Sequence, residues 1–458
     1  MNLPRLVVAA PGSGHGKTTL ATGIMAALRR RGLRVSGHKV GPDYIDPGYH
    51  ALATGRPGRN LDPYLVGEAR LVPLLLHGAA EPPGGAEMAD IAVIEGVMGL
   101  YDGQLGTSGF ASTAHVARVV DAPVVLVVDV SHASRSIAAV VLGMQAFDPA
   151  QRIAGVILNK AGSPRHAREV VDALPAGSVL GVIPRDAGVS APSRHLGLVP
   201  AAERPEAGAQ LDRLATQVEA HVDLDELVRI ACAATDLPGE PWSAAAAVQP
   251  VSGAPVIAVA GGRAFTFRYA ETTEMLRAAG CRVVEFDPTC DASLPAGTSG
   301  LYLGGGFPET FVTELSANTV LRQEIRSAIE AGLPTVAECA GLLYLCRSLD
   351  GAPMVGAIDA EAAMTPRLTL GYREAVETSG DRSVVRGHEF HRTAVTPGAG
   401  SPAAYRMQGR DEGFAGPVLS ASYLHVHWAG HPEAANRFAA QAAGVAPGAL
   451  VRDMSPRV

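Results

Sequence analysis

The chain has 458 residues, of which 47% are hydrophobic and 18% are charged, and its net charge is −7. A chain of this length corresponds to roughly two to four domains of ordinary size, and its mildly acidic balance gives no electrostatic reason to expect nucleic-acid binding. Its apolar runs are far shorter than the roughly 20 residues of a membrane helix, and no signal-peptide pattern follows Met1. The five cysteines form no CxxC pair and their number is odd, which argues against a disulfide framework or a structural zinc site. A soluble α/β protein of the reducing cytoplasm is predicted.

The first half of the chain alternates short β-branched runs with stretches long enough for helices. Continuous apolar strands separated in this way are typical of a parallel sheet covered by helices on both faces. A helix is predicted over residues 17–31, where apolar residues recur at helical spacing before Gly32. The predicted strands are residues 6–10, 34–39, 91–95, 124–129, 153–159 and 179–183.

The composition changes near residue 238, where prolines stand among small residues. Residues 238–254 are therefore predicted to link a domain of residues 1–237 to one of residues 255–458. A second α/β series follows the linker, and its later segments alternate more strongly, so they are expected to be partly antiparallel. The predicted strands of this half are residues 256–260, 282–286, 300–303, 335–337, 384–390 and 418–426.

A glycine-rich segment, PGSGHGKTT at residues 11–19, joins the first predicted strand to the first predicted helix. It matches the phosphate-loop pattern G-x-x-x-x-G-K-[ST] except for Pro11 at the first glycine. The glycines allow backbone N–H groups to curl around phosphate oxygens at the positive end of the helix. Lys17 is expected to contact the outer phosphates of ATP, and Thr18 to hold Mg²⁺. The predicted ATP-binding residues are Gly12, Ser13, Gly14, His15, Gly16, Lys17, Thr18 and Thr19.

An acidic residue, Glu95, ends the strand predicted over residues 91–95. It puts a carboxylate at the carboxyl edge of the sheet, where open α/β folds bind ligands. Two glycines and Asp102 follow in a loop that can approach a ligand. Glu95 is therefore a candidate ligand of Mg²⁺, directly or through water, and the alternative is a solvated acid at a strand end.

A second charged turn, HKVGPDYIDP, follows the strand predicted over residues 34–39. Asp43 and Asp46 are expected to hold a second metal ion or to position a substrate, while Lys39 neutralises charge on a transferred phosphoryl group. The alternative is structural, because G-P-D is also common turn chemistry.

A candidate nucleophile, Cys339, lies in PTVAECAGLLY at residues 334–344. Here a strand runs into a helix with small residues on both sides of the cysteine, which is the pattern of a nucleophile elbow. The helix N-terminus is expected to lower the pKa of the thiol. The other four cysteines are expected to be buried apolar residues.

A thiol nucleophile requires an oxyanion hole and a base. The segment LGGGFPE at residues 303–309 follows a strand and can present backbone N–H groups, and SYLHVHW at 422–428 ends a strand with His425 and His427 on one face. The histidine pair lacks a third ligand at a spacing suitable for a metal site. The predicted oxyanion donors are the N–H groups of Gly305, Gly306 and Ala340.

Taken in order behind SGHGKTT, the segments VGPDYIDPGYH, VIEGVMGLYDG, GGGFPE, AECAGLLYL, GHEFHRT and SYLHVHW resemble the cobyrinic/hydrogenobyrinic acid a,c-diamide synthase family. The resemblance covers nearly the whole chain. It implies an α/β fold with an N-terminal phosphate-loop domain similar to dethiobiotin synthetase, whose sheet is mainly parallel. It also implies a C-terminal α/β domain similar to class I glutamine amidotransferases. The implied reaction is the ATP- and glutamine-dependent conversion of two acetate side chains of a corrin precursor into amides.

The same resemblance implies roles for individual residues. The nucleophile falls on Cys339 and its activating base on His425, with His427 the weaker alternative. Ordinary class I amidotransferases carry a glutamate two positions after the histidine, and because His427 stands there, a dyad or a third partner from elsewhere is expected. The GHEFH segment at 387–391 has no assigned chemistry. The implied metal ligands are Thr18, Asp43 and Glu95, and the implied substrate contacts are Lys39, Tyr44, Ile45, Asp46 and Asp102.

Two rival functions explain parts of the sequence. A regulatory phosphate-loop ATPase would account for SGHGKTT but leaves AECAG and SYLHVHW without a purpose. A related amide synthetase acting on another acid would share the amidotransferase half, and the VGPDYIDP turn argues against it. The expected partners are a corrinoid acid, ATP, L-glutamine and Mg²⁺, without nucleic acid or membrane, and a homodimer is expected by analogy. The sequence does not distinguish a cobalt-free from a cobalt-containing substrate.

Overall fold

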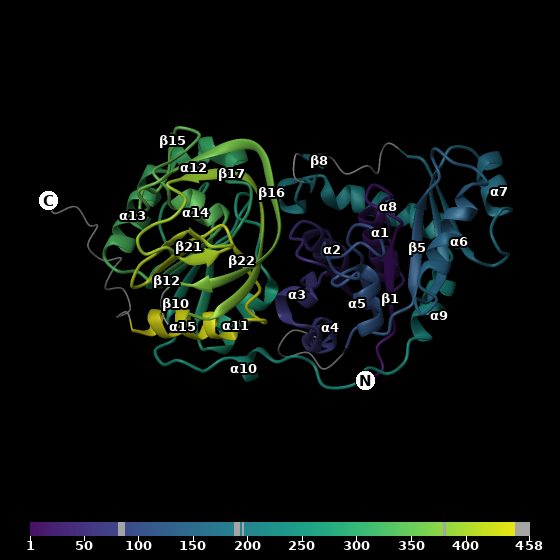
Figure 1. Ribbon diagram of the computed structural model, residues 1–458, viewed down its shortest axis with the longest axis horizontal. Helices are drawn as coiled ribbons and strands as arrows, with labels where there is room; N and C mark the ends of the chain where they lie inside the picture. Colours follow the sequence, from purple (N-terminus) through teal and green to yellow (C-terminus); the bar gives the residue numbers. More distant parts are fainter. Residues whose placement is uncertain (81–87, 187–192, 195–196, 379–381, 445–458) are drawn as a thin grey trace. The chain divides into compact units, whose positions relative to one another are not determined.

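The computed structural model describes residues 1–80, 88–186, 193–194, 197–378 and 382–444. The chain divides into two compact units, Met1–Trp242 and Ser243–Val458, drawn in purple to teal and in teal to yellow in Figure 1. The division falls inside the segment predicted as a linker. Parts of that segment belong to the two units themselves. Trp242 donates its N–H to Pro73 O within the first unit, and the short helix α10 (Ala244–Ala247) begins the second unit.

The first unit is built on a seven-stranded parallel sheet, in the order β3-β2-β4-β1-β5-β6-β7. Strand β1 lies at its centre, with β4 and β5 on either side, so the loop after β1 leaves the sheet at a point where connections diverge, which is where such folds bind ligands. Six of the strands were predicted and are confirmed within two residues. The seventh, β3, is too short and polar to be recognised. The strands are β1 (Arg5–Ala9), β2 (Val35–Val40), β3 (Arg59–Leu61), β4 (Ile91–Glu95), β5 (Val124–Asp129), β6 (Ile153–Ala161) and β7 (Val179–Pro184).

Helices pack against this sheet because their apolar residues share one face. The helix predicted after the phosphate loop is confirmed as α1 (Lys17–Arg30), and its Leu20 and Ile24 share a buried core with Val93 and Val125 of the sheet. Helices α8 (Ala207–His221) and α9 (Leu224–Cys232) complete that core. The remaining helices of the unit are α2 (Asp46–Thr54), α3 (Pro63–Val66), α4 (Leu71–Ala79), α5 (Thr113–Val119), α6 (Ile137–Phe147) and α7 (Pro164–Val171).

The second unit contains a six-stranded sheet in the order β11-β10-β12-β13-β21-β20, parallel except for the last pair. One face packs against α13 and α14 through a core that contains Leu301, Ile325 and Leu342. The strands are β10 (Val256–Ala260), β11 (Arg282–Phe286), β12 (Thr298–Leu303), β13 (Thr335–Glu338), β20 (Phe414–Ala415) and β21 (Leu419–Ser422). The helices are α11 (Ala270–Ala278), α12 (Val312–Ala317), α13 (Thr319–Glu330), α14 (Ala340–Leu345) and α15 (Pro432–Ala443).

A second, mainly antiparallel sheet carries the later segments, in the order β15-β14-β16-β17-β22 with β18 and β19 attached. The prediction of a single strand over 418–426 is wrong, because β21 and β22 lie in different sheets. The backbone leaves the ladder at Tyr423, whose N–H is donated to Glu412. These strands are β14 (Ser348–Leu349), β15 (Ala352–Pro353), β16 (Glu361–Glu377), β17 (Val384–Thr396), β18 (Tyr405–Met407), β19 (Arg410–Glu412) and β22 (His425–Val426).

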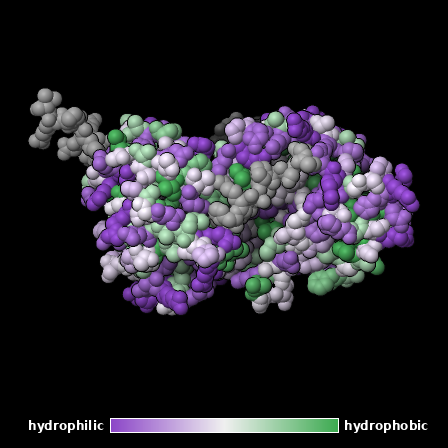
Figure 2. Space-filling view, turned by 90° about the horizontal axis from the view of Figure 1, so that it is seen from above, coloured by the Kyte–Doolittle hydropathy of each residue, from purple (hydrophilic) through white to green (hydrophobic). Residues whose placement is uncertain are grey.

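The surface is mixed in character. Polar and apolar residues are interspersed on the face drawn in Figure 2. Among the helices of the described residues, none is long and apolar enough to cross a membrane.

Candidate active sites

The phosphate loop, residues 11–19, leaves β1 and enters α1 at Lys17. Gly16 has a φ of +90°, and a Cβ there would lie only 2.3 Å from Asn159 Nδ2, so both backbone conformation and space require glycine. The Lys17 ammonium donates to the carbonyl oxygens of Gly12 at 3.0 Å and Met98 at 2.5 Å. The lysine is thus held at the mouth of the loop, close to the place where the motif requires a phosphate.

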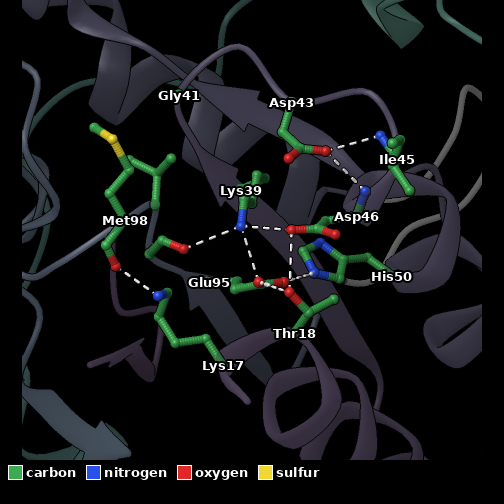
Figure 3. A network of polar contacts seen from close by, with 12 residues as sticks. Lys17, Thr18, Lys39, Gly41, Asp43, Ile45, Asp46, His50, Glu95 and Met98 are labelled. Atoms are coloured by element: carbon green, nitrogen blue, oxygen red, sulfur yellow. Dashed lines mark hydrogen bonds and ion pairs between the residues drawn. The ribbon is translucent and has the colours of Figure 1, made fainter. Parts of the chain in front are cut away.

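A buried cluster of charged and polar side chains adjoins the loop (Figure 3). The Thr18 hydroxyl donates to Glu95 Oε1 at 2.6 Å and lies 3.2 Å from Asp46 Oδ2. Lys39 Nζ lies 2.6 Å from Asp46 Oδ2 and 2.8 Å from Glu95 Oε1. His50 Nε2 lies 2.7 Å from the other Glu95 oxygen. Residues from α1, β2, α2 and β4 therefore converge on one carboxylate.

The charges in this cluster perturb one another strongly. Burial, reinforced by the Lys39 charge, lowers the pKa of Lys17 to about 8. Burial by itself would lower the pKa of Lys39, but Asp46 and Glu95 outweigh it and raise that pKa. Burial would also raise the pKa of Glu95, but Lys39 and His50 hold it below its usual range. The pKa of Asp46 is raised by burial and by the neighbouring carboxylates. Perturbed groups gathered at a sheet edge are characteristic of a functional site.

The two aspartates in the turn after β2, Asp43 and Asp46, make different contacts. Asp43 Oδ1 accepts the N–H groups of Ile45 at 2.8 Å and Asp46 at 2.9 Å, so it stabilises the start of α2. Asp46, rather than Asp43, reaches Thr18. The side chain of Ile45 is buried, at 6% exposed, and packs in the interior rather than presenting itself to a ligand.

Residues on β5 and β6 complete the rim of the loop. His15 Nδ1 accepts the N–H of Asp129, and the His15 carbonyl accepts from Asn159 Nδ2, both at 2.9 Å. Lys160 Nζ lies 2.9 Å from Gly14 O and 2.6 Å from Asp129 Oδ2. Sequence reasoning missed Asn159, Lys160 and His50, although the position of NK at the end of a predicted strand was a signal for the first two.

Oxygen donors dominate the place where the sequence predicts Mg²⁺. Thr18, Glu95 and Asp46 offer hydroxyl and carboxylate oxygens, the ligand types that Mg²⁺ prefers, so the residues fit this ion. In the described part of the chain, no group of three or more His, Cys, Asp and Glu side chains is arranged to hold a metal. A bound ion would therefore take further ligands from a nucleotide or water. Asp102 instead uses Oδ2 to accept the N–H of Gly99 at 2.9 Å.

Cys339 stands on a sharp turn between β13 and α14, with φ of +49° and ψ of −99°. A Cβ on Gly341 would lie 2.3 Å from Leu303 O, so the turn requires glycine at this position, two residues after the cysteine. The N–H of Cys339 is donated to Ser422 O at 2.8 Å. These features agree with a nucleophile elbow.

The expectation that the helix lowers the pKa of the thiol is wrong. Burial raises the pKa of Cys339, Glu309 raises it further, and the N–H of Ala340 only partly opposes them. α14 is a single short helix of 6 residues, and the sulfur lies inside the core. The thiol is therefore protonated at rest and needs a base. Of the other cysteines, Cys281 and Cys346 are buried as expected, whereas Cys232 and Cys290 are exposed.

The predicted oxyanion donors do not all have an available N–H. Gly305 exchanges two hydrogen bonds of 3.0 Å with Phe267, so its N–H is already donated to a carbonyl, and its assignment is corrected. The N–H of Ala340 faces the sulfur of Cys339. Gly306 and Ala340 remain the candidates.

The two histidines of SYLHVHW have different surroundings. His425 lies on β22 opposite His388 of β17, and their rings stack 5.0 Å apart. A Cβ on Gly305 would lie 2.3 Å from the His425 ring, which places that ring against the glycine segment. His427 lies beyond the strand, where its ring stacks 4.1 Å from that of Tyr269. His425 is therefore the histidine beside the predicted oxyanion segment, and His388 gives the GHEFH segment a place beside it.

The two halves of the chain match two family models. Residues 6–199 match the CobQ/CobB/MinD/ParA nucleotide binding domain, and residues 256–433 match the CobB/CobQ-like glutamine amidotransferase domain. The hydrogenobyrinate a,c-diamide synthase of Thermobifida fusca is 60% identical, with 96% of each chain covered. The chain belongs to the a,c-diamide synthase family. The resemblance noted from the sequence and its α/β, two-domain fold are thereby confirmed.

Other members of the a,c-diamide synthase family are also similar over nearly their whole length. The hydrogenobyrinate a,c-diamide synthase of Streptomyces coelicolor is 52% identical, covering 95% of this chain and 97% of that protein. The cobyrinate a,c-diamide synthase of a Synechococcus species is 42% identical, covering 93% and 96%. In this family's arrangement, the phosphate-loop site belongs to the nucleotide-binding domain and the Cys339 elbow to the amidotransferase domain.

Proposed function

We propose that this chain uses ATP and glutamine to amidate the a- and c-acetate carboxylates of hydrogenobyrinic acid in cobalamin biosynthesis. The observation that carries the proposal is the 60% identity to a hydrogenobyrinate a,c-diamide synthase over 96% of the chain. Relatives that are 50–60% identical to this chain are named for hydrogenobyrinate, and relatives that are 38–42% identical are named for cobyrinate. The cobalt-free acid is therefore the preferred substrate in this proposal, with the cobalt-containing acid as the alternative.

In the amidotransferase half, Cys339 attacks the side-chain carboxamide of glutamine. His425 accepts the thiol proton and then delivers it to the departing nitrogen, so ammonia leaves and a glutamyl thioester remains. The N–H groups of Gly306 and Ala340 are proposed to stabilise the oxyanion. Water activated by His425 then hydrolyses the thioester to glutamate and restores the thiol.

In the synthetase half, a corrinoid carboxylate attacks the γ-phosphate of ATP and displaces ADP, which gives an acyl phosphate. This activation is needed because a carboxylate is too poor an electrophile to react with ammonia directly. Lys17 and Lys39 oppose the charge that spreads over the transferred phosphoryl group. A triphosphate beside Lys17 favours its charged form and so offsets the depressed pKa. The acyl phosphate then reacts with ammonia, and phosphate leaves.

Mg²⁺ is proposed to be held by Thr18, with Glu95 and Asp46 directly or through water, and its chemistry is to neutralise phosphate charge. Asp43 remains a predicted ligand, although one of its oxygens serves the turn. Tyr44, Asp46 and Asp102 remain predicted substrate contacts, whereas Ile45 is withdrawn because its side chain is buried. The homodimer remains a prediction.

Mass spectrometry tests the reaction. Purified protein is given ATP, Mg²⁺, glutamine and either corrinoid acid, and each amidation lowers the product mass by about one unit because NH₂ replaces OH. Two successive shifts on hydrogenobyrinic acid are expected. Turnover of ATP and glutamine without a shift on either acid would remove the corrinoid from the proposal, and no glutamine turnover would favour the regulatory ATPase.

The Cys339→Ala variant tests whether glutamine hydrolysis and amide synthesis are carried out by separate halves of the chain. Glutamine-driven synthesis should be abolished, whereas synthesis from added ammonium should persist, because the synthetase residues are untouched. Glutamine-driven synthesis by this variant would refute the assigned nucleophile.

A further inference from the structure

We infer that Glu338 is the acidic positioning residue of the glutaminase: its carboxylate orients the His425 ring and stabilises the imidazolium that forms when this ring takes the proton of Cys339. This inference rests on the proposed function, in which Cys339 and His425 are nucleophile and base. It supplies the third partner that the sequence pattern lacks, since His427 occupies the position of the usual glutamate.

Two adjacent strands of one sheet and a strand of the other sheet bring this arrangement together. Glu338 ends β13 and directly precedes the nucleophile, while Tyr302 lies on the adjacent strand β12. Glu338 Oε2 accepts the Tyr302 hydroxyl at 3.1 Å and lies 3.8 Å from His425 Nδ1. The side chains of Glu338 and His425 are only 8% and 1% exposed, so solvent screens the pair weakly. The Tyr302 hydroxyl fixes the carboxylate, and the carboxylate faces the nitrogen that a general base does not use for the nucleophile.

Other buried or partly buried carboxylates of the same unit are engaged elsewhere. Each has a closer partner than the His425 ring, or faces the other histidine: Glu271 lies 3.7 Å from His427, Glu389 2.5 Å from Arg373, and Glu412 2.5 Å from Ser422. An ion pair of 3.8 Å joins His425 Nδ1 to Glu338 Oε2. Glu338 is therefore the carboxylate placed to act on this ring.

The surroundings of the thiol explain why such a partner is needed. Burial raises the pKa of Cys339, and the nearby carboxylates oppose a second negative charge. The thiolate can form in this environment only together with a cation, and the cation is the protonated ring. A carboxylate on the far side of the ring favours that cation, which is the task of the aspartate in a Ser-His-Asp triad.

The test is Glu338→Gln, which preserves shape but removes the charge. We expect kcat for glutamine hydrolysis to fall about 100-fold, the lower end of what a general acid–base group contributes, with KM for glutamine changed little. Tyr302→Phe should cause a smaller loss of several-fold, roughly the effect of one hydrogen bond. Ammonium-driven synthesis should stay at the wild-type rate in both variants, which shows that the synthetase half is intact, while the unchanged KM for glutamine shows that the glutaminase half still binds its substrate.

Glu377→Gln is the matched control. Glu377 and Glu338 line the same cavity of about 330 Å³, but Glu377 is paired with Arg437 at 2.5 Å. The Glu377→Gln replacement should leave kcat for glutamine hydrolysis within about twofold of wild type. A loss of packing or charge at Glu377 is not expected to affect His425, the base. An equal loss in both variants would overturn the inference.

A double variant shows whether Glu338 acts through His425. His425→Ala should abolish glutaminase activity, and adding Glu338→Gln to it should cause no further loss in the residual rate. A further drop of about 100-fold in the double variant, or full activity in Glu338→Gln, would overturn the inference. Full glutaminase activity in His425→Ala would instead refute the base itself, which belongs to the proposed function, and would overturn the inference with it.

Discussion

Replacing Glu95 by Gln removes the charge around which the phosphate-loop site is organised. Glu95 is fully buried and accepts from Thr18 at 2.6 Å, Lys39 at 2.8 Å and His50 at 2.7 Å. Breaking a buried ion pair by removing one partner costs about 3–5 kcal/mol. Because Asp46 still holds Lys39 at 2.6 Å, we expect the lower value, a loss of about 3 kcal/mol in the free energy of unfolding.

Urea unfolding followed by circular dichroism measures this loss, with Asp90→Asn as the control. Asp90 pairs with Arg34, but both side chains are about one-third exposed, so its replacement should cost under about 1 kcal/mol. Glu95→Gln should also damage both glutamine-driven and ammonium-driven synthesis. A loss of unfolding free energy no larger than that of Asp90→Asn would refute the reasoning.

The sign of the pH dependence follows from the same contacts. Burial would raise the pKa of Glu95, but Lys39 and His50 hold it below its usual range. Its stabilisation is therefore present above the unfolded value of about 4.3 and is lost as the pH falls through the lower folded pKa. The difference between wild type and Glu95→Gln should stay constant from pH 6 to pH 8 and shrink in acid, as urea unfolding at several pH values would show.

Three further predictions concern other residues. Gly16→Ala places a Cβ 2.3 Å from Asn159 Nδ2 at a φ of +90°, and such strain costs about 1–3 kcal/mol, so ATP should bind at least about fivefold more weakly by calorimetry. Burial raises the pKa of Glu412 to about 7, so its contribution to stability falls as the pH rises above the unfolded value. Wild type should lose up to about 3 kcal/mol of unfolding free energy between pH 5 and pH 8 that Glu412→Gln retains, and equal losses would contradict this. His425→Ala should abolish glutamine hydrolysis while His427→Ala keeps most of it, and the reverse order in a glutaminase assay would transfer the role of base to His427.

Much of the strand pattern follows from local sequence. Strands β4, β5 and β10 have the predicted bounds, because parallel strands buried on both faces are continuous apolar runs. The edge strand β11 also has the predicted bounds, although it is only partly buried. β16 was not predicted, since long stretches of it are exposed and it is held by pairing with β17 rather than by an apolar pattern of its own. The strand predicted over 418–426 failed for a related reason, because side chains remote in sequence turn the backbone at Tyr423.

The chemistry of the candidate sites was also readable, because glycines, a lysine and a threonine after a strand, or a cysteine between small residues, have few other uses. Lys17 and Thr18 lie where the motif predicts them, at the start of α1. Glu95 and Cys339 also lie as predicted, at the carboxyl ends of strands. The sequence by itself thus determined the family, the two kinds of domain and the candidate reactive groups. It did so because these depend on residue type and on neighbours in the chain.

Only the tertiary structure decided which groups act on one another. Asp46 rather than Asp43 reaches Thr18, Glu338 lies beside His425, and the pKa of the Cys339 thiol is raised rather than lowered. Each outcome depends on distances between segments far apart in the chain and on how completely packing removes water from a charge. Neither quantity has a local signature, because burial and electrostatic contact are properties of the packed interior.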